Sequence, residues 1–105
     1  MDTRSRDLMD YLSETMNHTD VSGFELLEIL DVRSRLATRE PLLNDEDKTQ
    51  LESLDRTLVE MAEVLLERIS EVADLAEMRH RAHVLPSHWW WYLDQIASLR
   101  RKAAG

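Results

Sequence analysis

Cysteine is absent from this sequence of 105 residues, and glycine and proline occur only twice each. The lack of cysteine excludes disulfides, thiolate metal sites and a cysteine nucleophile. The scarcity of glycine and proline leaves few of the turns that join β-strands. Because leucine, glutamate, arginine, alanine and methionine dominate the sequence, the composition predicts an all-α protein, and the length predicts a single helical domain over residues 1–105.

Long apolar runs and an excess of positive charge are also missing. No stretch approaches the roughly 20 apolar residues that cross a membrane, and the first residues do not have the apolar run of a signal peptide. The net charge of −8 argues against a general nucleic-acid or anionic-membrane surface, because lysine and arginine drive phosphate binding. We therefore expect a cytoplasmic protein whose partner is neither nucleic acid nor a membrane.

Start and stop signals predict two helices in the first part of the chain. Apolar residues at spacings of three and four predict a short helix over 5–17. Ser22 followed by Glu25 forms a capping box, which predicts a second helix over 22–39. This helix stops there because Pro41 disfavours helical geometry at the residue before it.

The third predicted helix is the longest, over 45–83, with Asn44 as its N-cap. Its apolar residues recur with a period near 3.5, as in a helical seam. The seam consists of Leu51, Leu54, Leu58, Met61, Leu65, Val72 and Leu75. The apolar face is wider than the seam, so we expect a small bundle in which this helix forms an antiparallel hairpin with 22–39 and also contacts short N- and C-terminal helices and a second copy of the chain.

The opposite face of the long helix carries carboxylates, here called the acidic ridge. The ridge consists of Glu60, Glu63, Glu67, Glu71, Asp74 and Glu77. Segment 45–78 is strongly acidic and segment 79–105 is basic, an asymmetry that favours an antiparallel homodimer over a parallel one.

The run HWWWY at 88–92 holds four of the six Phe, Tyr and Trp residues of the chain. On a last helix capped by Ser87 and running to about residue 102, Trp89 and Tyr92 face the core, whereas Trp91 points to the polar side. Exposed tryptophan is typical of protein interfaces. The predicted partner interface consists of Trp90, Trp91 and Gln95.

Glu77 and His80 form an E-x-x-H pair, which resembles the motif of the di-iron carboxylate bundles. The resemblance implies a ferritin-like metal-binding oxidoreductase, with His83 and His88 as further candidate ligands. It covers a single motif, whereas a di-iron site needs the motif twice and a further glutamate that faces inward. A solvated helix end is the alternative reading of these residues.

Arg68 and Arg79 are cations on the otherwise apolar seam. Such residues extend to the rim, pair with a facing carboxylate, or bind an anion. The pattern of Glu67 and Arg68 followed by Arg79 on one long helix resembles the helical chorismate mutases, in which cations on a long helix hold a dicarboxylate. That resemblance covers the one long helix and implies an anion site on it; a structural ion pair is the alternative.

The sequence contains no glycine-rich phosphate loop, nucleophile elbow or metalloprotease motif. We therefore predict a protein without a cofactor or catalytic residues: a small helical interaction, adaptor or regulatory protein that acts through protein–protein contacts as a homodimer. One alternative is an antitoxin, immunity or inhibitor protein whose acidic ridge binds a basic partner. The other is the ferritin-like oxidoreductase.

Overall fold

A computed structural model describes residues 3–17 and 22–104. Within these residues the chain forms six α-helices, two short 3-10 helices and no strand, so the predicted all-α class is confirmed. The α-helices are α1 (Thr3–Met16), α2 (Gly23–Ala37), α3 (Asp45–Glu60), α4 (Ala62–Ser70), α5 (Leu75–Arg81) and α6 (Leu93–Ala104), and the 3-10 helices are η1 (Glu40–Leu42) and η2 (Trp89–Tyr92).

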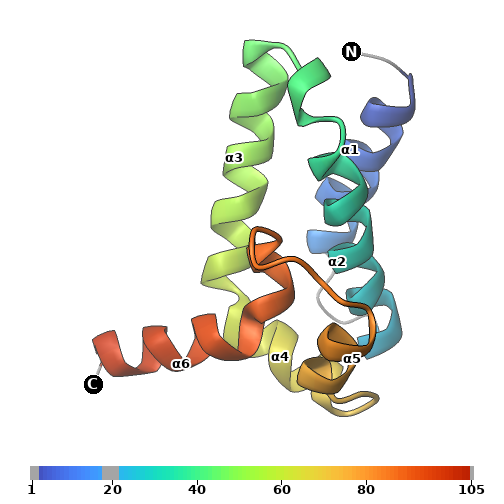
Figure 1. Cartoon of the computed structure of the whole chain (residues 1–105). Coiled ribbons are helices and arrows are strands. Elements are labelled where there is room, and N and C mark those ends of the chain that lie inside the picture. Colours follow the sequence, from blue (N-terminus) through green and yellow to red (C-terminus); the bar gives the residue numbers. More distant parts are fainter. Residues whose placement is uncertain (1–2, 18–21, 105) are drawn as a thin grey trace.

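The helices form two groups. Helices α1, α2 and α3 stand side by side, with α2 and α3 antiparallel, and α4, α5 and α6 lie at the lower end, where α6 projects sideways (Figure 1). Among the described helices, none combines the length and the apolar character needed to cross a membrane.

The caps of α2 and α3 lie where the sequence predicts them. The Ser22 hydroxyl accepts a hydrogen bond from the Glu25 backbone N–H at 3.3 Å, and the Asn44 side chain accepts one from the Asp47 N–H at 2.8 Å. Helix α2 ends at Ala37, and the chain then turns through η1. The starts of α2 and α3 are determined by nearby sequence, because each capping side chain satisfies a backbone donor in the first turn of its own helix.

The single helix predicted over 45–83 is wrong, because three helices occupy this stretch. The chain kinks at Met61, which separates α3 from α4, and it leaves helical geometry between α4 and α5. Helix α5 has its own N-cap, since the Asp74 side chain accepts a hydrogen bond from the Glu77 N–H at 3.2 Å. A period of 3.5 persists across such breaks, because each short helix keeps its own apolar stripe toward the core.

The core is built from the apolar faces of α1, α2, α3, α4 and α6. Its most deeply buried side chains are Met9, Leu12, Leu26, Ile29, Leu30, Leu36, Leu58, Leu65, Ile69 and Leu93. Helix α4 packs against both α2 and α6, so the chain itself covers the wide face for which the sequence analysis invoked a second subunit. The homodimer stays a prediction.

Gly23, the first residue of α2, lies directly on the end of α4. A Cβ atom at this position would lie 2.4 Å from the carbonyl oxygen of Arg68 and 2.8 Å from Cγ2 of Val72. Because the nearer atom belongs to the backbone, the contact is relieved only if α2 and α4 move apart. We expect Gly23→Ala to lower the free energy of unfolding by about 1–3 kcal/mol, measured by urea denaturation. In an open helix the same change is stabilising, so a gain in stability would contradict the packing of α2 on α4.

Candidate functional site

The aromatic run forms the 3-10 helix η2, and α6 begins only at Leu93, so the prediction of one helix capped by Ser87 is wrong. A 3-10 helix has about three residues per turn instead of 3.6, which changes the face on which each ring lies. Trp90 and Trp91 are buried, with 2% and 9% of their surfaces exposed, whereas Trp89 is half-buried.

The prediction that Trp91 points to solvent is therefore wrong. The proposed interface of Trp90, Trp91 and Gln95 depended on that orientation and loses its basis, although Gln95 itself is exposed. Trp90 and Trp91 instead pack on α2, where both contact Ser34.

Ser34 on α2 anchors this aromatic run. Its hydroxyl oxygen accepts a hydrogen bond from Nε1 of Trp90 at 2.9 Å and from Nε1 of Trp91 at 3.0 Å. The Nδ1 atom of His88 lies 3.2 Å from the same oxygen. Ser34 and His88 therefore have the spacing of a nucleophile and its base, but two indole donors occupy the hydroxyl oxygen, and a serine in that state is not a nucleophile.

Arg33, the residue before Ser34, is a buried cation with 3% of its surface exposed. Its Nε donates to Asp55 Oδ1 at 2.8 Å, and its Nη2 donates to Asp55 Oδ2 at 3.0 Å and to Glu40 Oε1 at 2.8 Å. Its guanidinium carbon lies 4.2 Å from the centroid of the Trp90 ring. Burial disfavours the charge, but the hydrogen bonds and charges of Asp55 and Glu40 outweigh it and raise the pKa of Arg33.

Arg79 on α5 holds the other side of the aromatic run. Its Nη1 donates to Asp94 Oδ1 at 2.8 Å and to the Trp91 carbonyl oxygen at 2.9 Å, and its guanidinium carbon lies 4.3 Å from the Tyr92 ring centroid. The hydrogen bond to Asp94 outweighs partial burial and raises the pKa of Arg79. Burial opposes ionisation of Asp94, but Arg79 lowers the pKa of this carboxyl.

This geometry bears on the anion site that the chorismate mutase resemblance implied. Arg79 is engaged in a structural ion pair, Arg68 belongs to a different helix, and Arg68 does not line the pocket that Arg79 lines. The continuous helix on which the resemblance rested is broken between them.

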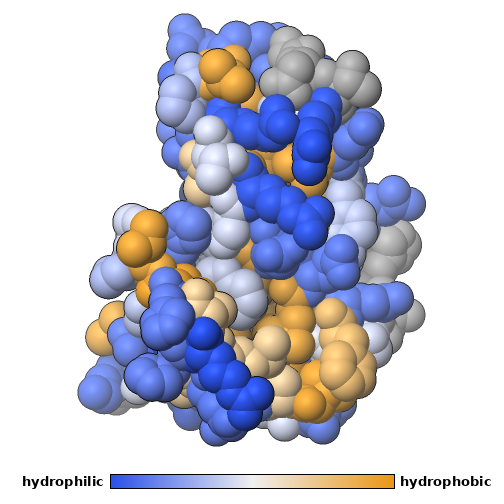
Figure 2. Space-filling view, turned by 45° about the vertical axis from the view of Figure 1, so that its right-hand side comes forward, coloured by the Kyte–Doolittle hydropathy of each residue, from blue (hydrophilic) through white to orange (hydrophobic). Residues whose placement is uncertain are grey.

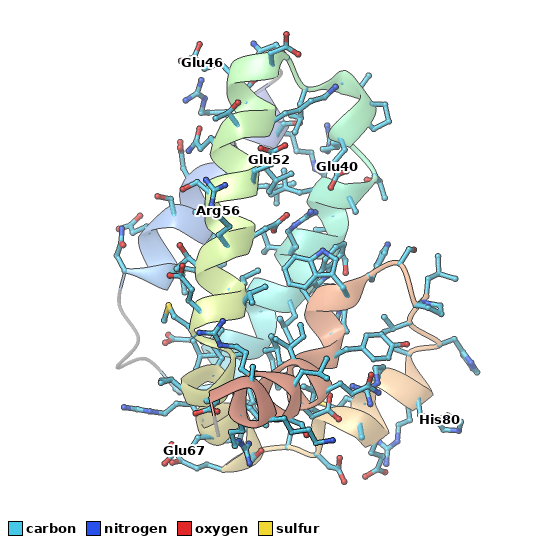
Figure 3. All side chains as sticks on the ribbon, turned by 90° about the vertical axis from the view of Figure 1, so that its left-hand side faces the viewer. Glu40, Glu46, Glu52, Arg56, Glu67 and His80 are labelled. Carbon is cyan, nitrogen blue, oxygen red and sulfur yellow. The ribbon has the colours of Figure 1, made fainter. Side chains whose placement is uncertain are left out.

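The candidate metal ligands are not brought together. Glu77 pairs with Arg81, one turn further along α5, and His88 contacts Ser34. The side chain of His80 points away from the body of the protein (Figure 3). Over residues 3–17 and 22–104, no group of three or more histidine, aspartate or glutamate side chains is arranged to hold a metal ion. The ligand set that the di-iron resemblance implied is therefore not assembled.

The turn that ends α5 positions two of these histidines. His83 adopts the left-handed backbone conformation, with φ 52°, and the Val84 N–H donates to the Arg79 carbonyl oxygen at 3.2 Å. This is a common way to close a helix. It leaves His80 and His83 exposed at the carboxyl end of α5, together with Arg81.

Two adjoining pockets flank α5 and share Ala76. The first, of about 480 Å³, has mainly apolar walls and is lined by Leu66, Ser70, Ala73, Asp74, Leu75, Ala76 and Asp94. The second, of about 360 Å³, is lined by Ala76, Arg79, His80, His83, Val84 and Tyr92. We call the two together the α5 groove. On the face shown in Figure 2, hydrophobic atoms gather at the lower end of the molecule, beside strongly hydrophilic side chains.

The chain matches no protein-family model, no curated protein and no solved structure.

Sequence reasoning missed Arg33 and Ser34. A signal for Arg33 does exist, because it lies three residues after Leu30 and three before Leu36, which places a cation on the buried face of α2. No local signal marks Ser34, whose partners follow more than 50 residues later in the chain.

Proposed function

We propose that this protein is a non-catalytic interaction module, and that its α5 groove binds an acidic segment of a partner protein that also carries an apolar side chain. The observation that supports this function is the joining of an apolar pocket to a cationic pocket at Ala76. Protein-binding sites commonly combine an apolar anchor pocket with a polar rim that selects the partner.

Charge favours an acidic partner segment. Arg79, His80 and His83 line one pocket of the groove, and Arg81 is exposed on the same helix. The described contacts of Arg79 use both hydrogens of Nη1 and one of Nη2, which leaves its Nε and the second Nη2 hydrogen for a ligand. The pocket around Arg79 therefore attracts a partner carboxylate, although the chain as a whole is acidic.

Rigidity also supports a binding role. Asp94, Tyr92 and the Trp91 carbonyl hold Arg79 in place before any ligand arrives. A side chain that is already ordered loses less conformational entropy on binding.

We expect Ala76→Glu to abolish binding to the groove, because the new carboxylate fills the junction of the two pockets and repels an acidic ligand. The probe is a fluorescein-labelled peptide of alternating leucine and glutamate, followed by fluorescence anisotropy. The unsubstituted protein should bind the peptide saturably, and binding should weaken as salt is added. Ala76→Glu should weaken binding by about tenfold or more, which corresponds to about 1.4 kcal/mol.

The matched control is Ala103→Glu, which adds the same charge at an exposed position of α6, outside the groove. It should leave peptide binding close to that of the original protein. Absence of peptide binding, or equal loss in both variants, would overturn the proposal.

The acidic ridge supports a second candidate function, binding to a basic partner as an antitoxin, immunity or inhibitor protein does. All six ridge residues are exposed. However, Glu63 pairs with Arg101 and Glu77 pairs with Arg81, so the chain neutralises part of the ridge itself. We therefore place the α5 groove first.

A further inference from the structure

Arg79 keeps an unused pair of N–H groups on the edge of its guanidinium that Asp94 does not occupy. Its Nη1 donates to Asp94 Oδ1 at 2.8 Å and to the Trp91 carbonyl oxygen at 2.9 Å, and its Nη2 donates to Asp94 Oδ2 at 3.3 Å. The hydrogen on Nε and the second hydrogen on Nη2 take no part in these contacts, and they lie parallel on one edge of the planar group. Such a pair binds two oxygens of one carboxylate or phosphate.

The free edge of Arg79 belongs to the cationic pocket of the α5 groove. Arg79 lines this pocket of about 360 Å³, whereas its partner Asp94 lines only the adjoining apolar pocket. His83 and Tyr92 add an imidazole and a hydroxyl group to the walls of the cationic pocket, and each has a hydrogen to donate even when the imidazole is neutral. Among the described residues, no carboxylate lines the cationic pocket.

We propose that the acidic group bound in the α5 groove is a phosphate, so that the partner segment is a phosphopeptide with its phosphoserine or phosphothreonine in the cationic pocket and an apolar side chain in the apolar pocket. This inference deepens the proposed function and rests on it. A carboxylate has two oxygens, and the free edge of Arg79 engages both. A phosphate has three terminal oxygens, so one remains to accept a hydrogen bond from His83 or Tyr92.

The carboxylates near Arg79 determine how the peptide lies in the groove. Asp74 and Asp94 line the apolar pocket, where they disfavour a second acidic group, so the phosphate and the apolar side chain do not exchange places. Because Asp94 balances the charge of Arg79, the preference for phosphate depends on the unused hydrogen bonds as well as on charge.

The experiment compares two fluorescein-labelled peptides by fluorescence anisotropy. One is the leucine–glutamate peptide, and in the other the central glutamate is replaced by phosphoserine. At about pH 7.5, where the phosphate is a dianion, we expect the phosphopeptide to bind about tenfold more tightly, because it makes an additional charge-assisted hydrogen bond. Equal affinity of the two peptides would overturn the inference and leave the proposed function standing. Absence of binding by either peptide would overturn both.

Arg79→Lys and Arg81→Lys are the matched variants. Lysine keeps the charge but has no parallel pair of N–H groups, so in Arg79→Lys the preference for the phosphopeptide should fall to about twofold or less. Arg81 is exposed on the same helix and lines neither pocket, so Arg81→Lys should keep the preference. A preference that persists in Arg79→Lys, or that disappears in Arg81→Lys, would overturn the assignment.

NMR of the unsubstituted protein keeps the inference testable if Arg79→Lys fails to fold. The Nε–H signal of Arg79 should shift when the phosphopeptide is added, because that group gains a hydrogen bond to phosphate. Arg33 is the internal control, since its Nε already donates to Asp55 at 2.8 Å and it lines neither pocket of the groove. Phosphopeptide binding without a shift of the Arg79 signal, or with an equal shift of both signals, would overturn the inference.

Lipid vesicles distinguish a phosphopeptide from a phosphate on a membrane. Vesicles of phosphatidylcholine with phosphatidic acid present the same phosphomonoester, but the net charge of −8 opposes approach to an anionic surface. We therefore expect no co-sedimentation with these vesicles. Co-sedimentation together with absence of phosphopeptide binding would overturn the inference in favour of a lipid headgroup.

Discussion

Replacing Arg33 by methionine is expected to lower the free energy of unfolding by about 3–5 kcal/mol, because it leaves a partly buried carboxylate without its cation. Asp55 accepts two hydrogen bonds from Arg33, and only 21% of its side chain is exposed. Glu40 contributes less, since 44% of its side chain is exposed and water can replace the guanidinium. Methionine keeps most of the buried volume, so the loss reports the charge and not a cavity. Urea denaturation followed by circular dichroism measures it.

Arg35→Ala is the matched control for Arg33→Met. Arg35 lies on the same helix and pairs with Asp31 at 2.8 Å, but both side chains are about half exposed. The loss should be no more than about 0.5 kcal/mol. Adding Asp55→Leu to Arg33→Met should recover part of the stability, because it removes the unpaired carboxylate. Equal losses in the two single variants would show that Arg33 is not a buried anchor.

The parts of the fold that were predictable depend on neighbours in the sequence. The capping hydrogen bonds of Ser22 and Asn44 span three residues each, so their signals are complete in a short stretch of sequence. The apolar stripe of α1 is similarly local, and the structure places Met9, Leu12 and Met16 in the core.

The sequence contains a local signal for the break before α5, but the apolar period near 3.5 also fits the single helix predicted over 45–83. Asp74 is followed three residues later by Glu77, and the Asp74 side chain caps the new helix. An aspartate three residues before a glutamate also fits the solvent face of a continuous helix. The sequence at this point therefore fits both structures.

The aromatic run could not be placed from its sequence. A helical wheel assumes 3.6 residues per turn, whereas η2 is a 3-10 helix. The contacts that favour this shorter turn lie far away in the chain, at Ser34 for the indoles of Trp90 and Trp91 and at Arg33 for the face of Trp90. The α5 groove depends on the same placement, since Tyr92 forms part of its wall.

Trp90→Ala should therefore be among the most destabilising single changes, with a loss of about 3–5 kcal/mol. Trp90 is 2% exposed, whereas the neighbouring Trp89 is half-buried. The loss in free energy of unfolding, measured by urea denaturation, should therefore be much larger for Trp90→Ala than for Trp89→Ala. Comparable losses in the two variants would mean that the rings are not placed as η2 places them.

Trp90→Phe separates the two contributions of the ring. Phenylalanine keeps an aromatic face for Arg33 but removes the N–H that donates to Ser34, so we expect an intermediate loss of about 1–3 kcal/mol. Arg33 and Trp90 are in direct contact, and residues in contact do not contribute independently. The double variant Arg33→Met with Trp90→Ala should therefore lose less than the sum of the single losses. Strict additivity would show that the cation and the ring do not stabilise each other.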